Sequence, residues 1–169
     1  MAPSTISELG FGTHYKIDCI RNGDVVWTES FNNLVVNTGL GYAMACIFGD
    51  HDVKPDSLYM GLCSNANSQP TDTAEDHMFV EFLGTTNMYR PIAIFSDGGI
   101  TEDNKYLYIA TDVQTMITVT SQIQGAFLTT EMVKGHDTGT LYGVAAFPGP
   151  REIESGDALL TTITVSAKG

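Results

Sequence analysis

The chain has 169 residues, of which 8 are basic and 20 acidic, so its formal net charge is −12 at pH 7. A charge of this sign repels phosphate backbones and anionic lipid headgroups, which argues against nucleic acid or a membrane surface as a direct partner. The apolar fraction of 43% is sufficient for one domain with its own core. The N-terminus shows no secretory signal pattern, and no segment approaches the roughly 18 consecutive apolar residues of a membrane span.

From the N-terminus onward, most of the chain carries signals of β-structure. Residues 14–20, HYKIDCI, alternate polar and apolar side chains with the two-residue period of a half-buried strand. The dipeptide Asn22-Gly23 then predicts a tight hairpin turn into a second strand, DVVWTESF. Further strands are expected at 57–63, 89–95, 105–111, 115–120, 124–130, 140–147 and 158–166. The last two flank an expected loop that contains Pro148 and Pro150, and LYGVAAF, apolar on both faces, is expected in the middle of a sheet.

One segment breaks the β pattern. Its apolar residues recur at the i, i+3, i+4, i+7, i+8 spacing of an amphipathic helix, and they are Leu40, Ala43, Met44, Ile47 and Phe48. Asn37 or Thr38 is expected to cap the start of this helix, and Gly49 to end it in the left-handed conformation. We expect Leu40, Met44, Ile47 and Phe48 to be buried. A weaker helical turn is predicted at 72–78, where Glu75 fits a capping box.

The predicted fold class is therefore mainly β. One helix, at about 39–48, among many strands is typical of a β-sandwich or jelly-roll-like fold with an amphipathic helix at one end or edge. The domain organisation that we predict is an N-terminal arm at 1–12 followed by a single β-rich domain at 13–169.

The turn Gly39-Leu40-Gly41 invites comparison with phosphate-binding loops. A dinucleotide fingerprint requires glycine or alanine at its third conserved position, so that the helix can approach the strand closely. Met44 occupies that position here, and no G-x-x-x-x-G-K-[ST] motif is present. The two glycines are better explained as a tightly packed helix start than as a nucleotide site.

No other constellation predicts catalysis or metal binding. The four histidines are scattered, Asp50-His51-Asp52 are adjacent residues that rarely converge on one ion, and the acidic clusters at 72–76 and 97–103 lack calcium-loop spacing. Cys63 and Trp27 are better explained as core residues than as a nucleophile and a sugar platform. Three widely spaced cysteines without a C-x-x-C pair predict reduced, buried thiols and synthesis in a reducing cytoplasm. We therefore predict no enzyme, no catalytic or metal-ligating residue and no cofactor.

A resemblance covers nearly the whole chain. Its segments, in order, are ESFNNLVVNTGLGYA, LYMGLCSN, PTDTAEDH, GAFLTT, KG, TGTLYGVAAF and SGDALLTTITVS. This succession resembles small virion structural proteins of tailed bacteriophages, of the capsid decoration or cement type. The resemblance implies a β-rich module on the capsid exterior, made in the cytoplasm of the host bacterium. It also implies the major capsid protein as partner and a homo-oligomer, with a trimer favoured.

The N-terminal arm is a candidate for the capsid or subunit interface. It is nearly free of charge and carries Ile6, Leu9 and Phe11 before the first clear strand. A frayed terminus is the alternative explanation of the same residues.

Two other functions stay open at this stage. A tail or appendage adhesin that binds host-surface glycans would show an aromatic cluster at a loop tip. An enzyme such as a glycan hydrolase would need two carboxylates about 5 to 10 Å apart in a cleft.

Overall fold

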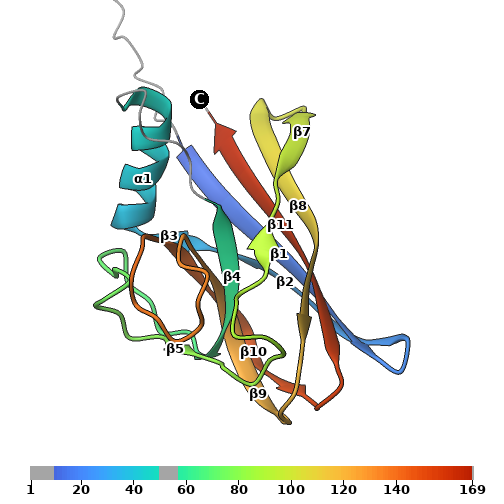
Figure 1. The fold of residues 1–169 in the computed structure, drawn as a ribbon. Helices are drawn as coiled ribbons and strands as arrows, with labels where there is room; N and C mark the ends of the chain where they lie inside the picture. The colour runs from blue at the N-terminus through green and yellow to red at the C-terminus, as the bar shows by residue number, and fades with distance from the viewer. Residues whose placement is uncertain (1–9, 50–56, 169) are drawn as a thin grey trace, which may run out of the picture.

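The computed structural model describes residues 10–49 and 57–168, which form two antiparallel sheets and one helix. Figure 1 shows the sheets as the two layers of a sandwich, with the helix beside them. The predicted fold class, a β-sandwich with one helix, is confirmed. In the described part of the chain no helix has both the length and the apolar character needed to cross a membrane.

The first sheet has five strands in the order β2-β1-β11-β8-β7. Their bounds are β1 Gly10–Arg21, β2 Asp24–Asn32, β7 Ser96–Ile100, β8 Lys105–Met116 and β11 Ala158–Lys168. The predicted turn between β1 and β2 is confirmed, because Asn22 and Gly23 both have positive φ, at 54° and 92°. β1 begins at Gly10, so residues 10–12 of the predicted arm belong to this strand.

The second sheet has the order β3-β10-β9-β4-β5, and β6 also pairs with β4. Its bounds are β3 Leu34–Val35, β4 Leu58–Asn65, β5 Val80–Glu81, β6 Ile92–Ala93, β9 Ser121–Thr129 and β10 Leu141–Ile153. The chain passes from one sheet to the other on both sides of the sandwich, from β2 into β3 and from β6 into β7. Chain connections therefore join the layers along both sides.

Apolar side chains lie on both faces of the second sheet. The main core, between the sheets, includes the completely buried Tyr15, Ile17 and Cys19 of β1, as the alternating pattern predicts. Leu128 of β9 packs in this core, whereas its neighbour Phe127 packs in a second cluster on the opposite face. β10 contributes to both clusters, which explains why LYGVAAF is apolar throughout.

Several strand predictions differ from the structure. Only 92–93 of the segment 89–95 is a strand. All of 105–111 and only residues 115–116 of 115–120 belong to the single strand β8, which is interrupted by a register shift near Asp112. Pro148 and Pro150 lie inside β10, not in a loop. The pairing of β10 with β9 shifts register between Ala146 and Arg151, and such an irregularity accommodates residues that cannot donate a backbone hydrogen bond.

The helix α1, Asn37–Phe48, ends where predicted, begins two residues before the predicted 39–48 and buries a different face. Leu40, Met44, Ile47 and Phe48 are 37%, 42%, 55% and 72% exposed, so the prediction that they are buried was wrong. Gly39 is the buried residue of α1, and Tyr42 and Ala43 pack against the main core. A Cβ atom at Gly39 would lie 2.0 Å from the carbonyl oxygen of Tyr142. The absence of a side chain at Gly39 therefore lets the helix rest on β10 with Gly39, Tyr42 and Ala43 on its inner side.

The predicted ends of the helices also need correction. The N-cap of α1 is Val36, which has no capping side chain, while Thr38 donates a hydrogen bond to the carbonyl oxygen of Leu141 at 2.8 Å. Gly49 has a φ of −72°, so it is not left-handed. Residues 72–78 form turns rather than a helix, because local side chains bind the backbone there.

Candidate functional site

The predicted interface residues lie at one end of β1. Phe11 is half-buried and pairs with Ala167 of β11, on the same face of the sheet as the buried Tyr15. It is the first residue of that inward row in β1, and it is less buried than Thr13 and Tyr15, which follow it in the row. Ile6 and Leu9 lie outside the described residues.

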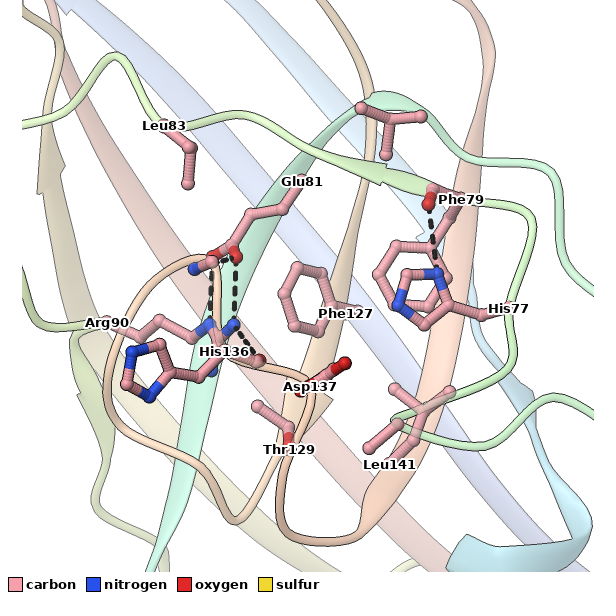
Figure 2. A pocket seen from close by; sticks show the side chains of 13 residues that line it. His77, Phe79, Glu81, Leu83, Arg90, Phe127, Thr129, His136, Asp137 and Leu141 are labelled. Carbon is pink, nitrogen blue, oxygen red and sulfur yellow. Dashed lines mark hydrogen bonds and ion pairs between the residues drawn. The ribbon is translucent and has the colours of Figure 1, made fainter.

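A hollow of about 290 Å³ lies on the outer face of the second sheet. Phe127, Thr129 and Leu141 come from β9 and β10, and segments 77–83 and 135–137 provide the walls. Figure 2 shows His77 and Phe79 on one side of the Phe127 ring, with Arg90 and His136 on the other. The hollow thus combines apolar strand residues with polar groups from two loops.

An ion pair between Arg90 and Glu81 is the central polar contact of this hollow. Arg90 Nε donates to Glu81 Oε1 and an Arg90 terminal nitrogen donates to Glu81 Oε2, both at 2.8 Å. The Arg90 side chain is only 3% exposed, and its guanidinium carbon lies 5.1 Å from the centre of the Phe127 ring. This bidentate geometry, with an aromatic ring beside the cation, suits arginine and not lysine.

The remaining contacts of Arg90 hold the loop between β9 and β10. Its terminal nitrogens donate to the carbonyl oxygens of Glu131, at 2.6 Å, and His136, at 3.1 Å. Gly135 N donates to the other side of the pair, Glu81 Oε2, at 2.7 Å. Four of the five N–H donors of Arg90 are therefore engaged within the protein, so the guanidinium is a brace for the loop and not an available anion-binding group.

Neighbouring groups reinforce the same loop. Hydrogen bonds from Thr138 and from the backbone N–H of Val133 hold the pKa of the Glu131 carboxyl below its ordinary value. Lys134 Nζ donates to Thr85 Oγ1 at 2.6 Å and to its carbonyl oxygen at 3.1 Å, while burial lowers the pKa of this lysine. The loop is thus tied to the segment that precedes Arg90 as well as to Arg90 itself.

On the opposite wall, His77 lies flat against Phe79. The ring centroids are 3.8 Å apart, and His77 Nδ1 is 3.0 Å from the carbonyl oxygen of Phe79. Phe79 in turn contacts Phe127, with centroids 4.9 Å apart. The His77 ring therefore covers the second apolar cluster at Phe79.

The residues that were considered for catalysis or sugar binding, Cys63 and Trp27, pack in the hydrophobic clusters of the protein. Burial raises the pKa of the Cys63 thiol well above its ordinary value, which keeps it protonated and a poor nucleophile. Trp27 packs against the main core and donates to the carbonyl oxygen of Glu152 at 3.0 Å, so the core interpretation is confirmed. Of the three cysteines, Cys19 and Cys63 are buried and Cys46 is half-exposed.

The carboxylates of the two acidic clusters accept hydrogen bonds from backbone N–H groups in nearby turns. Among the described residues they do not form a set of metal ligands. Asp72 accepts a hydrogen bond from Gln69 N, and Asp97 accepts one from Gly99 N. Across residues 10–49 and 57–168, no three histidine, cysteine or acidic side chains gather closely enough to hold a metal ion. Asp50-His51-Asp52 falls outside the described residues.

Sequence reasoning missed the Arg90 brace, although a signal was present. Arg90 is the only charged residue between Phe82 and Ser96. An isolated arginine in an apolar stretch indicates a buried cation that needs a partner. Its partner, Glu81, could not have been chosen from the sequence, because loop geometry decides which carboxylate lies nearby.

The most prominent exposed feature is apolar. We call the side chains of Leu40, Met44, Ile47 and Phe48 the α1 face, and α1 contains no charged residue. A second exposed group lies along residues 88–94, where Met88, Tyr89, Ile92 and Ile94 project from the protein.

These surfaces, together with the braced hollow, are the features from which function can be inferred. No protein-family model, no curated protein and no solved structure matches it.

Proposed function

We propose that this chain is a non-enzymatic structural protein of a bacteriophage virion, and specifically a decoration protein that binds the outer shell and stabilises the mature head. The observation that carries this proposal is the exposure of large apolar side chains on α1 and along residues 88–94 of a strongly acidic chain. Contiguous apolar surface is unusual on a monomeric protein and is typical of protein contacts. The order of the segments resembles that of small phage virion proteins, and from this resemblance we infer that the partner is a virion.

The internal ion pairs fit a module that transmits mechanical load. Arg21 pairs with Asp157 at 2.8 Å and so ties β1 to the turn between β10 and β11. Arg151 pairs with Glu29, which joins β10 to β2 across the two sheets. In both pairs the carboxylate is buried and the arginine is partly exposed, so each pair adds a charge-assisted hydrogen bond between separate elements, which supports a role that requires rigidity.

The proposal assigns the shell contact to the predicted interface residues, Ile6, Leu9 and Phe11. Phe11 supports this assignment because it ends the inward row of β1 without being fully buried. Segment 1–9 precedes it directly, so a contact made there would be anchored to the central part of the first sheet.

Cryo-electron microscopy of purified particles that contain the chain tests this function. Density for the sandwich at regular positions on the outer capsid surface is the expected result. Density confined to tail fibres, with none on the shell, would overturn the decoration proposal and favour an adhesin.

One observation favours the adhesin as a second candidate. Tyr106 and Tyr108 are exposed near the tip of the β7–β8 hairpin, with ring centroids 5.8 Å apart, and the hydroxyl of Tyr106 donates to Asp97 at 2.8 Å. Aromatic faces beside a carboxylate can stack on a sugar ring and accept hydrogen bonds from its hydroxyl groups. Glycan-array binding that Tyr108→Ala abolishes and Tyr89→Ala preserves would support this function, whereas binding that both variants retain would exclude the hairpin.

A further inference from the structure

We propose that the hollow on the outer face of the second sheet binds a lysine side chain of a partner protein. The stem of this lysine lies over Phe127 and Leu141. Its ammonium group donates hydrogen bonds to the Asp137 carboxylate and to Nε2 of His77. Only the identity of the partner rests on the proposed function, in which the lysine belongs to a protein of the capsid shell.

The hollow has the size and the apolar lining that one side chain requires. Its volume of about 290 Å³ is too small for a helix or a strand of a partner, and it is at the lower limit of small-molecule sites. Phe79, Phe127 and Leu141 belong to the second apolar cluster and line the hollow. Long cationic side chains bury their methylene groups against such a surface and keep the charged end near water.

His77 places a hydrogen-bond acceptor on one side of the hollow. Its Nδ1 lies 3.0 Å from the carbonyl oxygen of Phe79, and because a carbonyl oxygen can only accept, Nδ1 carries the proton. Nε2 of the neutral ring is therefore an acceptor, and no group among the described residues donates to it. In Figure 2 this second ring nitrogen is directed toward Phe127.

Asp137 places a carboxylate on the other side. The preceding carbonyl oxygen, that of His136, accepts a hydrogen bond from Arg90 at 3.1 Å, which fixes the loop at this point. Within the described part of the chain, no hydrogen bond or ion pair engages the Asp137 carboxylate, and Figure 2 shows it directed toward the space between Phe127 and Leu141. Asp137 is exposed, so an ammonium group beside it keeps part of its hydration and avoids the full cost of desolvation.

The charges that line the hollow select a cation. Glu81 and Arg90 compensate each other, so with neutral histidines Asp137 leaves one uncompensated negative charge. An anionic ligand gains little here, because Arg90 is the one lysine or arginine among the described residues that line the hollow, and it is already engaged. The net charge of −12 also attracts basic partners and repels acidic ones.

The arrangement of the two acceptors favours lysine over arginine. An ammonium group is compact and has three donors that rotate freely, so it can meet a carboxylate and an imidazole nitrogen that lie on different sides. A guanidinium group binds a carboxylate best through two parallel hydrogen bonds in one plane. In that geometry arginine would use Asp137 and leave His77 Nε2 without a donor.

Exposed apolar side chains beside the hollow favour a protein over a free amine as the source of the ammonium group. Met78, Val80 and Leu83 are exposed, and Val80 and Leu83 also line the hollow. A single side chain binds weakly, because its few contacts must offset the freedom that is lost on association. A loop that carries the lysine between apolar residues can also contact these neighbours, which a free amine cannot do.

An NMR titration of the isotope-labelled chain with Nα-acetyl-lysine amide tests the site. We expect chemical-shift changes at residues 77–83 and 135–137, with a millimolar Kd. Nα-acetyl-norleucine amide has a similar stem without the ammonium group and should bind far more weakly, as should Nα-acetyl-arginine amide. Asp137→Asn should weaken lysine binding at least about tenfold, because it removes the charged acceptor. The matched control is Asp103→Asn, an exposed carboxylate between β7 and β8, which should bind as the wild type does.

A second variant and a second ligand sharpen the test. His77→Phe keeps an aromatic ring against Phe79 and loses Nε2, so it should also weaken binding. A short peptide with one lysine between apolar residues should bind more tightly than cadaverine, a free diamine. Thermal melts show whether each variant is folded.

Four results would overturn the lysine site. They are equal binding of the norleucine and lysine amides, tighter binding of the arginine amide, wild-type affinity in Asp137→Asn, and tighter binding of cadaverine than of the peptide. The last result would assign the hollow to free amines. Because these titrations use only the isolated chain, their failure leaves the decoration function standing, and the absence of binding to shells would leave the lysine site standing.

Discussion

At the scale of single residues, the fold depends on a few buried charges whose hydrogen bonds are satisfied. Asp157 is 1% exposed, and its carboxylate accepts two hydrogen bonds from Arg21, at 2.8 and 2.9 Å, and one from Glu154 N, at 2.8 Å. The Arg21 hydrogen bonds are the main cause that lowers the pKa of Asp157 to about 2. A buried carboxylate with such partners stabilises the protein only while it is ionised.

The first prediction concerns the pH dependence of stability. The folded-state pKa of Asp157 lies below the roughly 3.9 of an unfolded chain, so its contribution is complete above about pH 4 and is lost as the pH falls toward 2. We expect the wild-type free energy of unfolding to fall by about 2 to 3 kcal/mol across this range because of Asp157. Urea melts of wild type and Asp157→Asn at several pH values measure the difference.

Asp157→Asn should lose this part of the pH dependence and be destabilised near neutral pH. The exposed Asp103→Asn is its control and should follow the wild-type curve. If the free energy of unfolding of wild type and of Asp157→Asn changed equally with pH, the Asp157 carboxylate would not be the cause of the pH dependence.

The second prediction concerns Arg90. Replacement of Arg90 by methionine leaves the carboxylate of Glu81 buried with only the Gly135 N–H, and we expect a loss of roughly 3 to 5 kcal/mol. The double variant Arg90→Met with Glu81→Leu should recover part of this loss, because no unpaired charge remains. Lys16→Met, which breaks an exposed pair with Asp18, should cost less than about 1 kcal/mol. Equal urea midpoints for the Arg90 and Lys16 variants would contradict the brace.

At the scale of elements, α1 shows how one small residue decides which face of a helix is buried. Gly39 has no space for a side chain against the backbone of Tyr142, whereas a Cβ atom at Gly41 would have nothing within 4 Å. Both glycines lie within the helix, so they differ mainly in what surrounds them.

The third prediction uses this contrast. We expect Gly39→Ala to destabilise the protein by about 1 to 3 kcal/mol, since the backbone of β10 or α1 must move. Gly41→Ala should stabilise it by up to about 1 kcal/mol, because alanine favours the helix and loses less backbone freedom on folding. Thermal melts compare the two variants, and a similar loss at both positions would show that close packing at Gly39 is unimportant. Phe48→Ala should cost little in the isolated chain, because Phe48 is largely exposed.

The same element shows what the sequence could and could not predict. Periodicity located α1 and the β1–β2 hairpin, because both patterns are local. The buried face of α1 could not be read in this way, since Leu40 and Ile47 favour one face and Gly39 with Ala43 favours another. Contact with Tyr142, a residue about 100 positions away, decided between them. The continuation of β10 through Pro148 and Pro150 could likewise not be predicted, because it depends on pairing with residues 121–123 of β9.

The candidate site was less predictable than the fold for a related reason. The brace joins Arg90 to Glu81 and to the carbonyl oxygens of Glu131 and His136, so it exists only when β5 and two loops meet. A sequence pattern can indicate that Arg90 needs a partner, but it cannot show which segments lie next to Arg90 in the folded protein. Phe11 was identified from its apolar character, and its place at the end of a strand required the structure.

At the scale of the whole molecule, two closely connected sheets form a support for surfaces at their ends and sides. Backbone connections join the layers on both sides, and the Arg151–Glu29 pair adds a link between β10 and β2. A rigid support keeps separate contact surfaces at fixed spacing, so that several weak contacts can form together. Under the proposed decoration function, this arrangement would bind a repeating lattice more tightly than a single isolated partner.

The last prediction tests that consequence for the proposed shell contact. A decoration protein should bind expanded shells far more tightly than isolated capsid subunits, by about 10² to 10⁴-fold, because only the lattice offers all contacts at once. Deletion of residues 1–9 leaves β1 intact from Gly10, so the thermal melt should be unchanged while binding to shells weakens. Co-sedimentation with shells and with subunits measures both effects, and Leu9→Ala is a milder variant of the same contact. If the truncated chain bound shells as tightly as the full chain, the contact would have to lie elsewhere on the sandwich. If neither chain preferred shells over subunits, the decoration function itself would be wrong.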